Sequence, residues 1–253
     1  MSLNEYRLIA DILHGSAILL LFYHILKSRS CHSVSGITVM LYAIIFTCRY
    51  LDLYPFDWYS FAHFSIFAYN SIFKIFYLAS HYLILILIYG VFRNTRDRSI
   101  NTSPIFGYLI CAHLLTWSTC YSGDIQQLDR EFFWRFSIFL EMFAIIPQMS
   151  LIHKQGVISI TMSHYLMLLG LYRALYIANW ISRYRNEQFW EPIGFFCGCV
   201  QTMIYLCFFI HVFPRLNKAK PYETIEIVKE KVNDINLSVN EKMDRDVPLI
   251  HDV

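Results

Sequence analysis

The chain of 253 residues has few charged side chains. Only 16% of its residues are Asp, Glu, Lys or Arg, whereas about a quarter are charged in an ordinary soluble protein. This leaves too little polar surface to cover a soluble domain of such length. Nine glycines and seven prolines, against 21 Phe and 18 Tyr, also exclude collagen-like, low-complexity and disordered chains. With 56% apolar residues and a mean hydropathy of +0.41, the composition indicates an integral membrane protein.

Three further patterns are missing. The seven cysteines have no regular spacing, and Cys197 and Cys199 lack the two-residue separation of a zinc or redox pair, so we expect them to be buried apolar residues. Lys and Arg occur in short clusters between apolar runs, which gives no basic stripe for a nucleic acid. The N-terminus lacks the pattern of a cleavable signal peptide, so the first apolar segment is expected to act as the targeting signal.

Seven apolar segments have about the length that crosses a bilayer. They cover Leu8–Leu26, Ile37–Leu53, Ser65–Phe92, Pro104–Tyr121, Phe132–Ile152, Ile160–Ile181 and Pro192–Phe213. The third is overlong, so part of Trp58–Phe67 can lie at the membrane interface. The predicted fold class is therefore an all-α integral membrane protein with seven transmembrane helices.

The positions of Lys and Arg predict the orientation, because cytosolic connections carry the excess. One set of connections and the tail hold nine: Lys27, Arg29, Arg93, Arg96, Arg98, Lys154, Arg215, Lys218 and Lys220. The opposite set holds four: Arg7, Arg130, Arg183 and Arg185. We expect a lumenal N-terminus and a cytosolic C-terminus. The sequons at Asn101 and Asn236 would then be cytosolic and carry no glycan.

The chain divides into a membrane domain, residues 1–217, and a cytosolic tail, residues 218–253. From Pro221 the composition changes to Lys, Glu, Asp and Asn, and the tail is predicted to be disordered. Its residues Ile225, Val228, Val232 and Ile235 have helical spacing, which leaves a short amphipathic helix as an alternative.

A weak internal repeat is present in the membrane domain. Ile37-Thr38 is followed twelve residues later by Arg49-Tyr50, and Ile160-Thr161 is followed thirteen later by Arg173 and Tyr176. Seven spans then divide into three helices, a linker helix and three more in parallel orientation, as in sugar transporters of the SWEET type.

Polar side chains inside the spans indicate a functional site, because ionisable groups in lipid are costly. On the predicted topology nearly all of them fall in the lumenal half of the membrane, where a water-filled cavity is expected. They are Arg7, Asp11, His14, Arg49, Tyr50, Asp52, Glu131, Trp134, Glu141, Tyr172, Arg173, Tyr176, Asn179, Trp180, Arg183 and Glu191. For any one of them a structural ion pair remains an alternative. Lys74 and Arg135 can face the lumen or snorkel, and His24, His63, His81, His113 and His164 are expected to be packing residues.

The charges of these cavity residues restrict the class of ligand that the cavity can bind. Arg7, Arg49 and Arg183 can each bind a carboxylate in bidentate fashion, and acidic groups beside Trp180 suit a cation. A short acidic peptide that carries a lysine has this charge pattern. The sequence contains no catalytic triad, no paired metal ligands and no Gly-rich phosphate loop, so we expect neither an enzyme nor a cofactor.

Motifs along most of the chain resemble the ER lumen protein-retaining receptor (KDEL receptor) family. Their order and approximate spacing hold from Arg7 to about Lys220. They include Lys27-Ser28-Arg29-Ser30-Cys31, Arg49-Tyr50-Leu51-Asp52-Leu53, Tyr69-Asn70 with Lys74, Trp134 with Leu140-Glu141, Pro147-Gln148, Ser163-His164-Tyr165-Leu166, Tyr172-Arg173, Leu175-Tyr176, Asn179-Trp180-Ile181 and Arg183-Tyr184.

The resemblance implies a receptor of the ER and cis-Golgi membranes. Such a receptor binds C-terminal Lys/His-Asp-Glu-Leu signals of escaped ER lumenal proteins in the acidic Golgi and returns them to the ER in COPI vesicles. Its expected partners are these peptides, the COPI coat, ARF-GAP and the bilayer.

The resemblance also implies roles for single residues. Arg49 and Tyr50 would bind the terminal carboxylate, and Arg7 and Arg183 the acidic side chains of the signal. Its first, basic residue would meet Asp52, Glu131, Trp180 and Glu191. The pH sensor would be His14, and the internal lock Glu141, Tyr172, Arg173, Tyr176 and Asn179. Lys218 and Lys220 would recruit the coat.

The chain departs from the family pattern at four places. Glu191 replaces an Asp, Arg135 replaces a small hydroxyl residue, residues 54–62 include an insertion, and the tail is long. A SWEET or PQ-loop small-solute transporter is the alternative function, although the concentrated charges suit no neutral sugar. A G-protein-coupled receptor fits less well, because Arg49 lies at the lumenal end of its helix.

Overall fold

The computed structural model describes residues 4–51, 64–97, 104–120 and 125–219, with two short pieces at 232–233 and 236–237. The described residues are almost entirely helical. The principal helices are α1 (Glu5–Ser28), α2 (Gly36–Arg49), α3 (Phe64–Ile86), α4 (Pro104–Thr119), α5 (Ile125–Ala144), α6 (Ile146–Gln155), α7 (Ile160–Glu187) and α8 (Pro192–Cys207).

Shorter elements extend these helices. α3 continues through a π-helical turn, η3 (Leu87–Val91), and a 3₁₀ turn, η4 (Arg93–Thr95). α8 continues in the same way through η5 (Phe208–Val212) and η6 (Phe213–Arg215). Two three-residue strands, β1 (Val157–Ser159) and β2 (Asn217–Ala219), pair in parallel with Val157 opposite Asn217.

Polar residues cap three of the long helices. The side chains of Asn4, Ser35 and Ser159 accept hydrogen bonds from the backbone N–H groups three residues later, at the starts of α1, α2 and α7. Each cap satisfies a donor that the helix itself leaves without a partner. The helix boundaries are therefore encoded locally.

The predicted fifth span, Phe132–Ile152, is divided into two helices. α5 ends at Ala144 and α6 begins at Ile146, with Pro147 in its first turn. Proline has no N–H and its ring clashes with the preceding turn, so it is tolerated at a helix start and breaks a helix interior. The apolar run therefore continues through the break while the helix does not.

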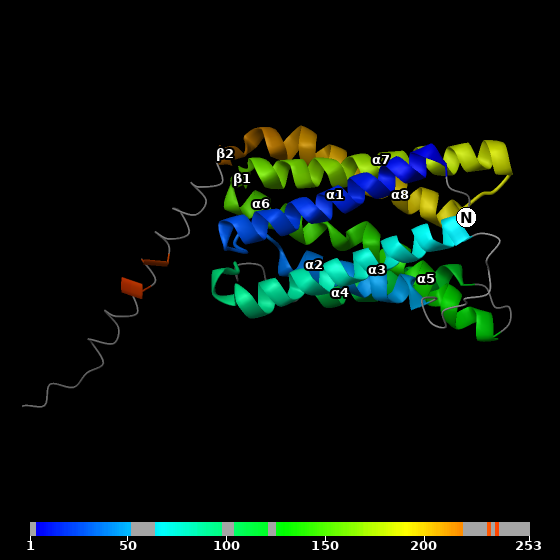
Figure 1. Cartoon of the computed structure of the whole chain (residues 1–253), viewed down its shortest axis with the longest axis horizontal. Helices are drawn as coiled ribbons and strands as arrows, with labels where there is room; N and C mark the ends of the chain where they lie inside the picture. Colours follow the sequence, from blue (N-terminus) through cyan, green and yellow to red (C-terminus); the bar gives the residue numbers. More distant parts are fainter. Residues whose placement is uncertain are drawn as a thin grey trace, which may run out of the picture.

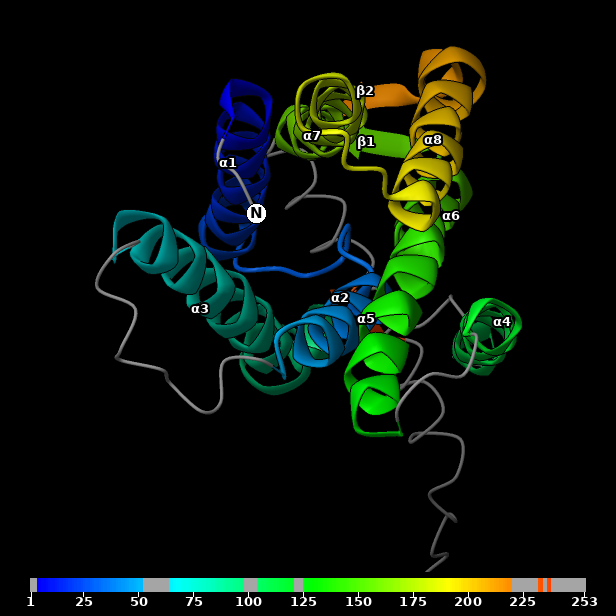
Figure 2. The same ribbon diagram turned by 90° about the vertical axis from the view of Figure 1, so that its right-hand side faces the viewer.

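Six of the helices form a ring. Viewed along the bundle, α1, α3, α2, α5, α8 and α7 follow one another around it, and α4 lies outside against α5 (Figure 2). The helices run lengthwise, with the start of α1 at one end and the β1–β2 pair at the other (Figure 1). At the strand end, Gln148 of α6 accepts a hydrogen bond from the Ser35 N–H and donates one to the Ser33 carbonyl, both 2.8 Å.

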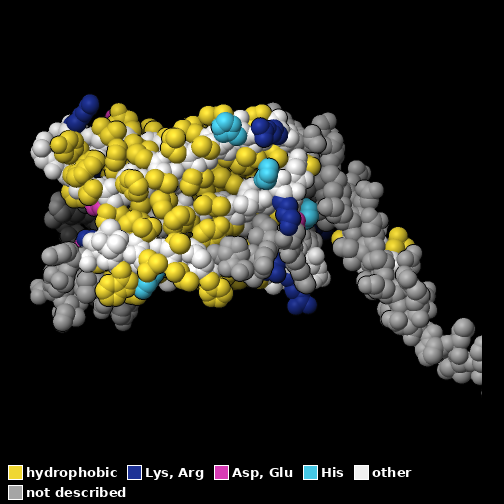
Figure 3. Space-filling view, turned by 180° about the vertical axis from the view of Figure 1, so that it is seen from behind, with side chains coloured by type: hydrophobic (Ala, Val, Ile, Leu, Met, Phe, Trp, Pro, Cys, Tyr) yellow, Lys and Arg dark blue, Asp and Glu magenta, His cyan; other side chains and the backbone are white. Residues whose placement is uncertain are grey.

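The surface of the bundle is apolar around its middle. The space-filling view shows a broad hydrophobic area between more polar ends, with several Lys and Arg side chains at one end (Figure 3). Ile72, Phe106 and Ile210 are 65%, 71% and 63% exposed, which suits lipid contact. Four helical segments are long and apolar enough to cross a bilayer: Glu5–Ser28, Ala68–Val91, Arg130–Gln155 and Pro192–Arg215. The protein is therefore of the multi-pass membrane type.

Three other predicted spans are helical but fall outside that set. Gly36–Arg49 and Ile105–Thr119 are apolar and shorter. α7 has 28 residues and carries Arg173, Arg183 and Arg185, so its polarity rather than its length sets it apart.

Candidate ligand-binding cavity

The six-helix ring surrounds a cavity of about 480 Å³ in the half of the bundle where α1 begins. Side chains from all six helices line it, whereas α4 contributes none. The polar and aromatic lining residues include Arg7, Asp11, His14, Phe46, Arg49, Tyr50, Asn70, Lys74, Tyr77, Trp134, Glu141, Tyr172, Arg173, Tyr176, Asn179, Trp180, Arg183, Glu191 and Gln201.

The opposite half of the ring is filled by apolar side chains. Ile25 of α1, Leu41 of α2 and Leu166 of α7 are fully buried there, on helices that also carry cavity residues. The cavity therefore does not continue through the bundle to the strand end.

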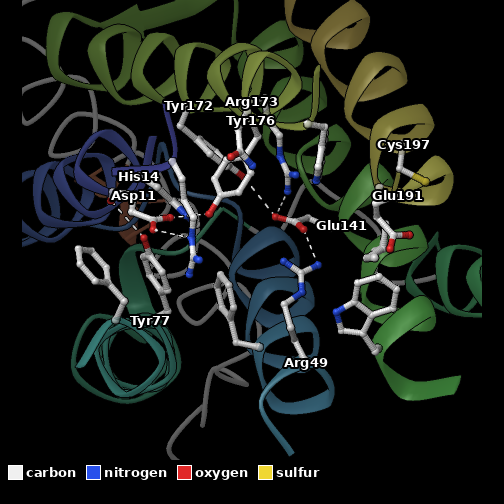
Figure 4. Close-up of a pocket in the computed structure, with 18 of the residues that line it drawn as sticks. Asp11, His14, Arg49, Tyr77, Glu141, Tyr172, Arg173, Tyr176, Glu191 and Cys197 are labelled. Atoms are coloured by element: carbon white, nitrogen blue, oxygen red, sulfur yellow. Dashed lines mark hydrogen bonds and ion pairs between the residues drawn. The ribbon is translucent and has the colours of Figure 1, made fainter. Parts of the chain in front are cut away.

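Glu141 lies at the centre of the cavity wall and is buried. Its Oε2 lies 2.5 Å from Nη2 of Arg49, and its Oε1 pairs with Arg173 and accepts a hydrogen bond of 3.1 Å from the Tyr172 hydroxyl (Figure 4). A carboxylate held this way is stabilised only while its partners remain, because a buried charge without a partner is costly. Glu141 thus joins α2, α5 and α7.

Arg49 is held from a second side as well. Its Nε donates to Ser137 Oγ at 3.1 Å, and Ser137 in turn donates to the Trp134 carbonyl at 2.6 Å. Ser137 lies one helical turn before Glu141 on α5, so one face of α5 positions the whole guanidinium.

A second buried carboxylate, Asp11, lies on the other side of the cavity. It accepts hydrogen bonds from Tyr69 at 2.8 Å and Tyr176 at 2.5 Å, and Arg7 Nε lies 3.7 Å away. Arg7 also donates to Asn70 Oδ1 at 2.5 Å. Asp11 therefore links α1 to α3 and α7, and it orients the cation at the cavity entrance.

The His14 ring is buried between two tyrosine rings. Its centroid lies 4.3 Å from that of Tyr172, with the planes 4° apart, and 4.6 Å from that of Tyr77. Tyr172 therefore contacts His14 with its ring and Glu141 with its hydroxyl (Figure 4). A change at either group reaches the other through one side chain.

The entrance of the cavity is formed by Trp180, Arg183 and Glu191. Arg183 Nε donates to Glu187 at 2.9 Å, and its guanidinium lies 4.1 Å from the centroid of the Phe189 ring. Glu191 is the N-cap residue of α8. Burial raises the pKa of its carboxyl, against the opposing effects of a backbone hydrogen bond from Gly194 and the nearby Arg135.

Most of the residues predicted from the sequence meet in this cavity. Arg7, His14, Arg49, Tyr50, Glu141, Tyr172, Arg173, Tyr176, Asn179, Trp180, Arg183 and Glu191 all line it. Glu131 does not: it is 52% exposed and pairs with Arg135 at 2.5 Å. Asp52 and Lys220 lie outside the described residues, and of Lys218 only the backbone, in β2, is described.

Several lining residues had no role assigned from the sequence. Asp11 was expected in the cavity, on one helix face with Arg7 and His14, and Lys74 was expected to face the lumen or snorkel, but neither was given a part in ligand binding. Tyr77 and Phe46 had no signal in the sequence, because an aromatic residue in an apolar helix is equally expected in the core. Gln201 donates to the Glu141 carbonyl at 3.2 Å, a contact that spacing does not predict.

The lining has an excess of positive charge. Five described cations, Arg7, Arg49, Lys74, Arg173 and Arg183, stand against three acids, Asp11, Glu141 and Glu191. Such a cavity favours an anionic ligand with more than one carboxylate. Among the residues that the structure describes, no cluster of His, Cys, Asp and Glu could hold a metal ion.

Comparisons with known proteins identify the family. The family model described as ER lumen protein retaining receptor matches residues 30–183. ER lumen protein-retaining receptor 3 of Xenopus tropicalis is 38% identical over 220 residues, which cover 86% of this chain and 96% of that protein. Receptor 2 of Homo sapiens is 39% identical over 218 residues, 86% of this chain and 97% of that protein. With this extent of similarity, the chain belongs to the ER lumen protein-retaining receptor family, a family of receptors rather than enzymes.

Proposed function

We propose that the protein binds C-terminal KDEL- or HDEL-type signals of ER lumenal proteins in the acidic Golgi and returns them to the ER. The observation that carries this proposal is a cavity with five cations converging on it from four helices, since such a peptide brings a terminal carboxylate and two acidic side chains. In this proposal Arg49 and Tyr50 bind the terminal carboxylate, while Arg7 and Arg183 bind the acidic side chains. Trp180 and Glu191, with Asp52, meet the first, basic residue, and Glu131 lies beside this position in its ion pair with Arg135.

Binding at Arg49 would be coupled to the buried ion pairs. A ligand carboxylate that approaches Arg49 competes with Glu141 for the same guanidinium. Arg173 and the Tyr172 hydroxyl can retain Glu141 when Arg49 turns to the ligand. Glu141, Tyr172, Arg173, Tyr176 and Asn179 then act as a lock that rearranges when the peptide binds.

His14 is proposed as the pH sensor of this lock. Its protonated form is favoured in the Golgi, where a cation beside Tyr172 and the acidic groups would stabilise the ligand-bound state, and its neutral form in the ER would favour release. A difference of one pH unit changes a single-site equilibrium at most about tenfold. By linkage, the bound peptide must raise the proton affinity of His14 by the same factor by which protonation raises peptide affinity.

The proposed architecture is a seven-span bundle of residues 1–217 with a parallel 3+1+3 repeat. The position of α4 outside the ring supports its assignment as the linker helix (Figure 2). The proposed orientation has a lumenal N-terminus in the ER and cis-Golgi membranes. The tail, residues 218–253, would be cytosolic and disordered, and Lys218 and Lys220 would recruit the COPI coat, with ARF-GAP as a further partner.

The direct test is binding of a labelled peptide that ends in Lys-Asp-Glu-Leu to the purified protein. It would be measured at about pH 5.5 and about pH 7.4, with the C-terminally amidated peptide as control. We expect tight binding at the acidic pH, weaker binding at neutral pH and none after amidation. Absence of binding to this peptide and to His-Asp-Glu-Leu at both pH values would contradict the proposal.

The transporter alternative rests on the repeat and on Pro147-Gln148. Gln148 is buried and bonded to backbone groups of Ser33 and Ser35, away from the cavity lining. It therefore joins α6 to the connection before α2 and does not line the cavity. Uptake of a small solute into proteoliposomes would be the outcome that favours a transporter.

A further inference from the structure

Two acidic side chains lie near the cavity entrance on different elements. Glu191 precedes α8 and lines the cavity, whereas Glu131 of α5 does not, although Trp134 on the next turn of α5 does. Glu131 is instead paired with the side chain of Arg135.

Arg135 lies one turn after Glu131 and bonds to two helices. Its Nη2 donates to Glu131 Oε1 at 2.5 Å, and its Nη1 donates to the Thr119 carbonyl in the last turn of α4. The carbonyls of a last helical turn have no partner within the helix and carry partial negative charge, so they attract a cation. Arg135 is only 19% exposed. It is thereby fixed against α4, and it holds Glu131 with it.

Of the acidic side chains near the cavity entrance, only Glu191 is without an ion pair among the residues that the structure describes. Arg135 neutralises Glu131, and Arg183 is paired with Glu187. Glu191 forms no ion pair with any residue that the structure describes, and it experiences Arg135 and Glu131 as charges of opposite sign. A ligand cation beside Trp180 therefore meets the unpaired carboxylate of Glu191 and a neutralised Glu131.

We propose that Arg135 is a specificity-determining residue that weakens the preference for a basic first residue in the retrieval signal by holding Glu131 in an ion pair away from the cavity. The inference rests on the proposed function, because it concerns one position of the same peptide. The receptor then discriminates between Lys and a neutral residue at this position mainly through Glu191 and the face of the Trp180 ring.

The experiment measures the dissociation constants of two peptides, ending in Gln-Asp-Glu-Leu and Lys-Asp-Glu-Leu, and takes their ratio. Replacing Arg135 by Ser frees Glu131, and we expect the ratio to rise about threefold to fivefold, the range of a partly exposed charge pair. Arg135→Lys, the matched control, keeps the charge beside Glu131 and leaves the ratio at the wild-type value.

A second pair of variants separates charge from folding. Glu131→Gln alone should lower the ratio, because it leaves the Arg135 cation at the entrance without its neutralising carboxylate. Added to Arg135→Ser, the same change should return the raised ratio to the wild-type value. Both Arg135→Ser proteins lack the bond to Thr119, so a loosened α4 cannot account for a difference between them.

The outcomes also separate the two proposals. If wild-type protein binds neither peptide, or binds the amidated peptide equally well, the proposed function fails. If binding requires the free carboxylate but Arg135→Ser leaves the ratio unchanged, or the double variant keeps the raised ratio, the role of Arg135 is overturned and the receptor function stands.

Discussion

Arg49 is the residue on which carboxylate recognition depends most directly. It faces the cavity and is held by Glu141 and Ser137. Arg49→Ala removes one partner of a desolvated charge pair, a change that typically costs about 2–5 kcal/mol. We expect peptide affinity at acidic pH to fall at least about thirtyfold, measured by titration with labelled peptide.

The matched control for this variant is Arg185→Ala. Arg185 is an exposed arginine near the end of α7 and does not line the cavity. It should retain wild-type affinity. Equal losses in the two variants would show that the effect reflects overall charge rather than a site at Arg49.

His14 lends itself to a substitution that separates packing from protonation. His14→Phe preserves an aromatic ring between Tyr77 and Tyr172 but cannot bind a proton. We expect affinity at about pH 5.5 to fall to the value at about pH 7.4, so that the pH response, which a single site limits to about tenfold per pH unit, disappears. The same titrations on His164→Phe, at an exposed position, should show the wild-type response; a pH response that survives in His14→Phe would remove His14 from the mechanism.

The raised pKa of Glu191 predicts a second pH effect with the opposite sign. Because burial shifts this carboxyl upward, it takes up its proton early as the pH falls, and its attraction for a ligand ammonium is lost in the acidic range. The ratio of dissociation constants for Gln-Asp-Glu-Leu and Lys-Asp-Glu-Leu should therefore decrease on acidification. Glu191→Gln should make the ratio independent of pH, while a ratio that increases on acidification would contradict this role.

For single residues, the sequence predicts which charged side chains line the cavity, but it does not predict which ion pairs and hydrogen bonds each of them forms. Arg7, Arg49, Glu141 and Arg183 were recognisable because charge in an apolar helix is costly. The pairing of Glu131 with Arg135 depends on a choice of rotamer that also involves Thr119 of another helix. Such a choice is made by tertiary contacts, so spacing of four residues predicts that the pair is possible and no more.

Among the elements, α8 shows how a helix can support a binding surface through its small residues. A Cβ atom added at Gly198 would lie 2.7 Å from Cζ3 of Trp180, and one at Gly194 3.1 Å from Cζ2 of the same ring. The absence of side chains at these two positions lets the indole approach α8 closely. The position of the Trp180 ring therefore depends on the two glycines of α8, Gly194 and Gly198.

Gly198→Ala tests this arrangement. The added methyl group must displace the Trp180 ring, so we expect a several-fold loss of peptide affinity and a destabilisation of about 1–3 kcal/mol from overpacking. Gly107→Ala in α4 is the control, because nothing lies within 4 Å of its new Cβ, and it should be neutral or slightly stabilising. Thermal unfolding in detergent and peptide titration measure both; an unaltered Gly198→Ala protein would contradict the packing argument.

The helices themselves were largely predictable, and their ends less so. The apolar runs located every principal helix, and Pro147 accounts for the break between α5 and α6. α7 continues from the predicted end at Ile181 to Glu187, because the polar residues after Ile181 can leave the apolar layer and still continue the helix. Hydropathy therefore predicts the membrane-embedded part of a helix rather than its full length.

For the whole molecule, the proposed orientation makes a prediction about glycosylation. Asn101 and Asn236 both lie in acceptor sequons, and both would face the cytosol, where no glycan is added. Protein made with microsomes should show no change in mass after endoglycosidase treatment. In intact microsomes, a C-terminal tag should be removed by added protease; protection of the tag, or a glycan at either sequon, would reverse the orientation.

The lengths of α2 and α4 can be compared with the thickness of the hydrocarbon layer in different membranes. α2 has 14 residues and α4 has 16, which correspond to about 21 and 24 Å, whereas the hydrocarbon layer is about 27 Å thick in the ER and about 32–33 Å at the plasma membrane. Burying two short helices in the thicker layer requires the bilayer to thin or the helix ends to be pulled into lipid. Hydrophobic mismatch would thus favour a thin membrane such as that of the ER over a thicker one.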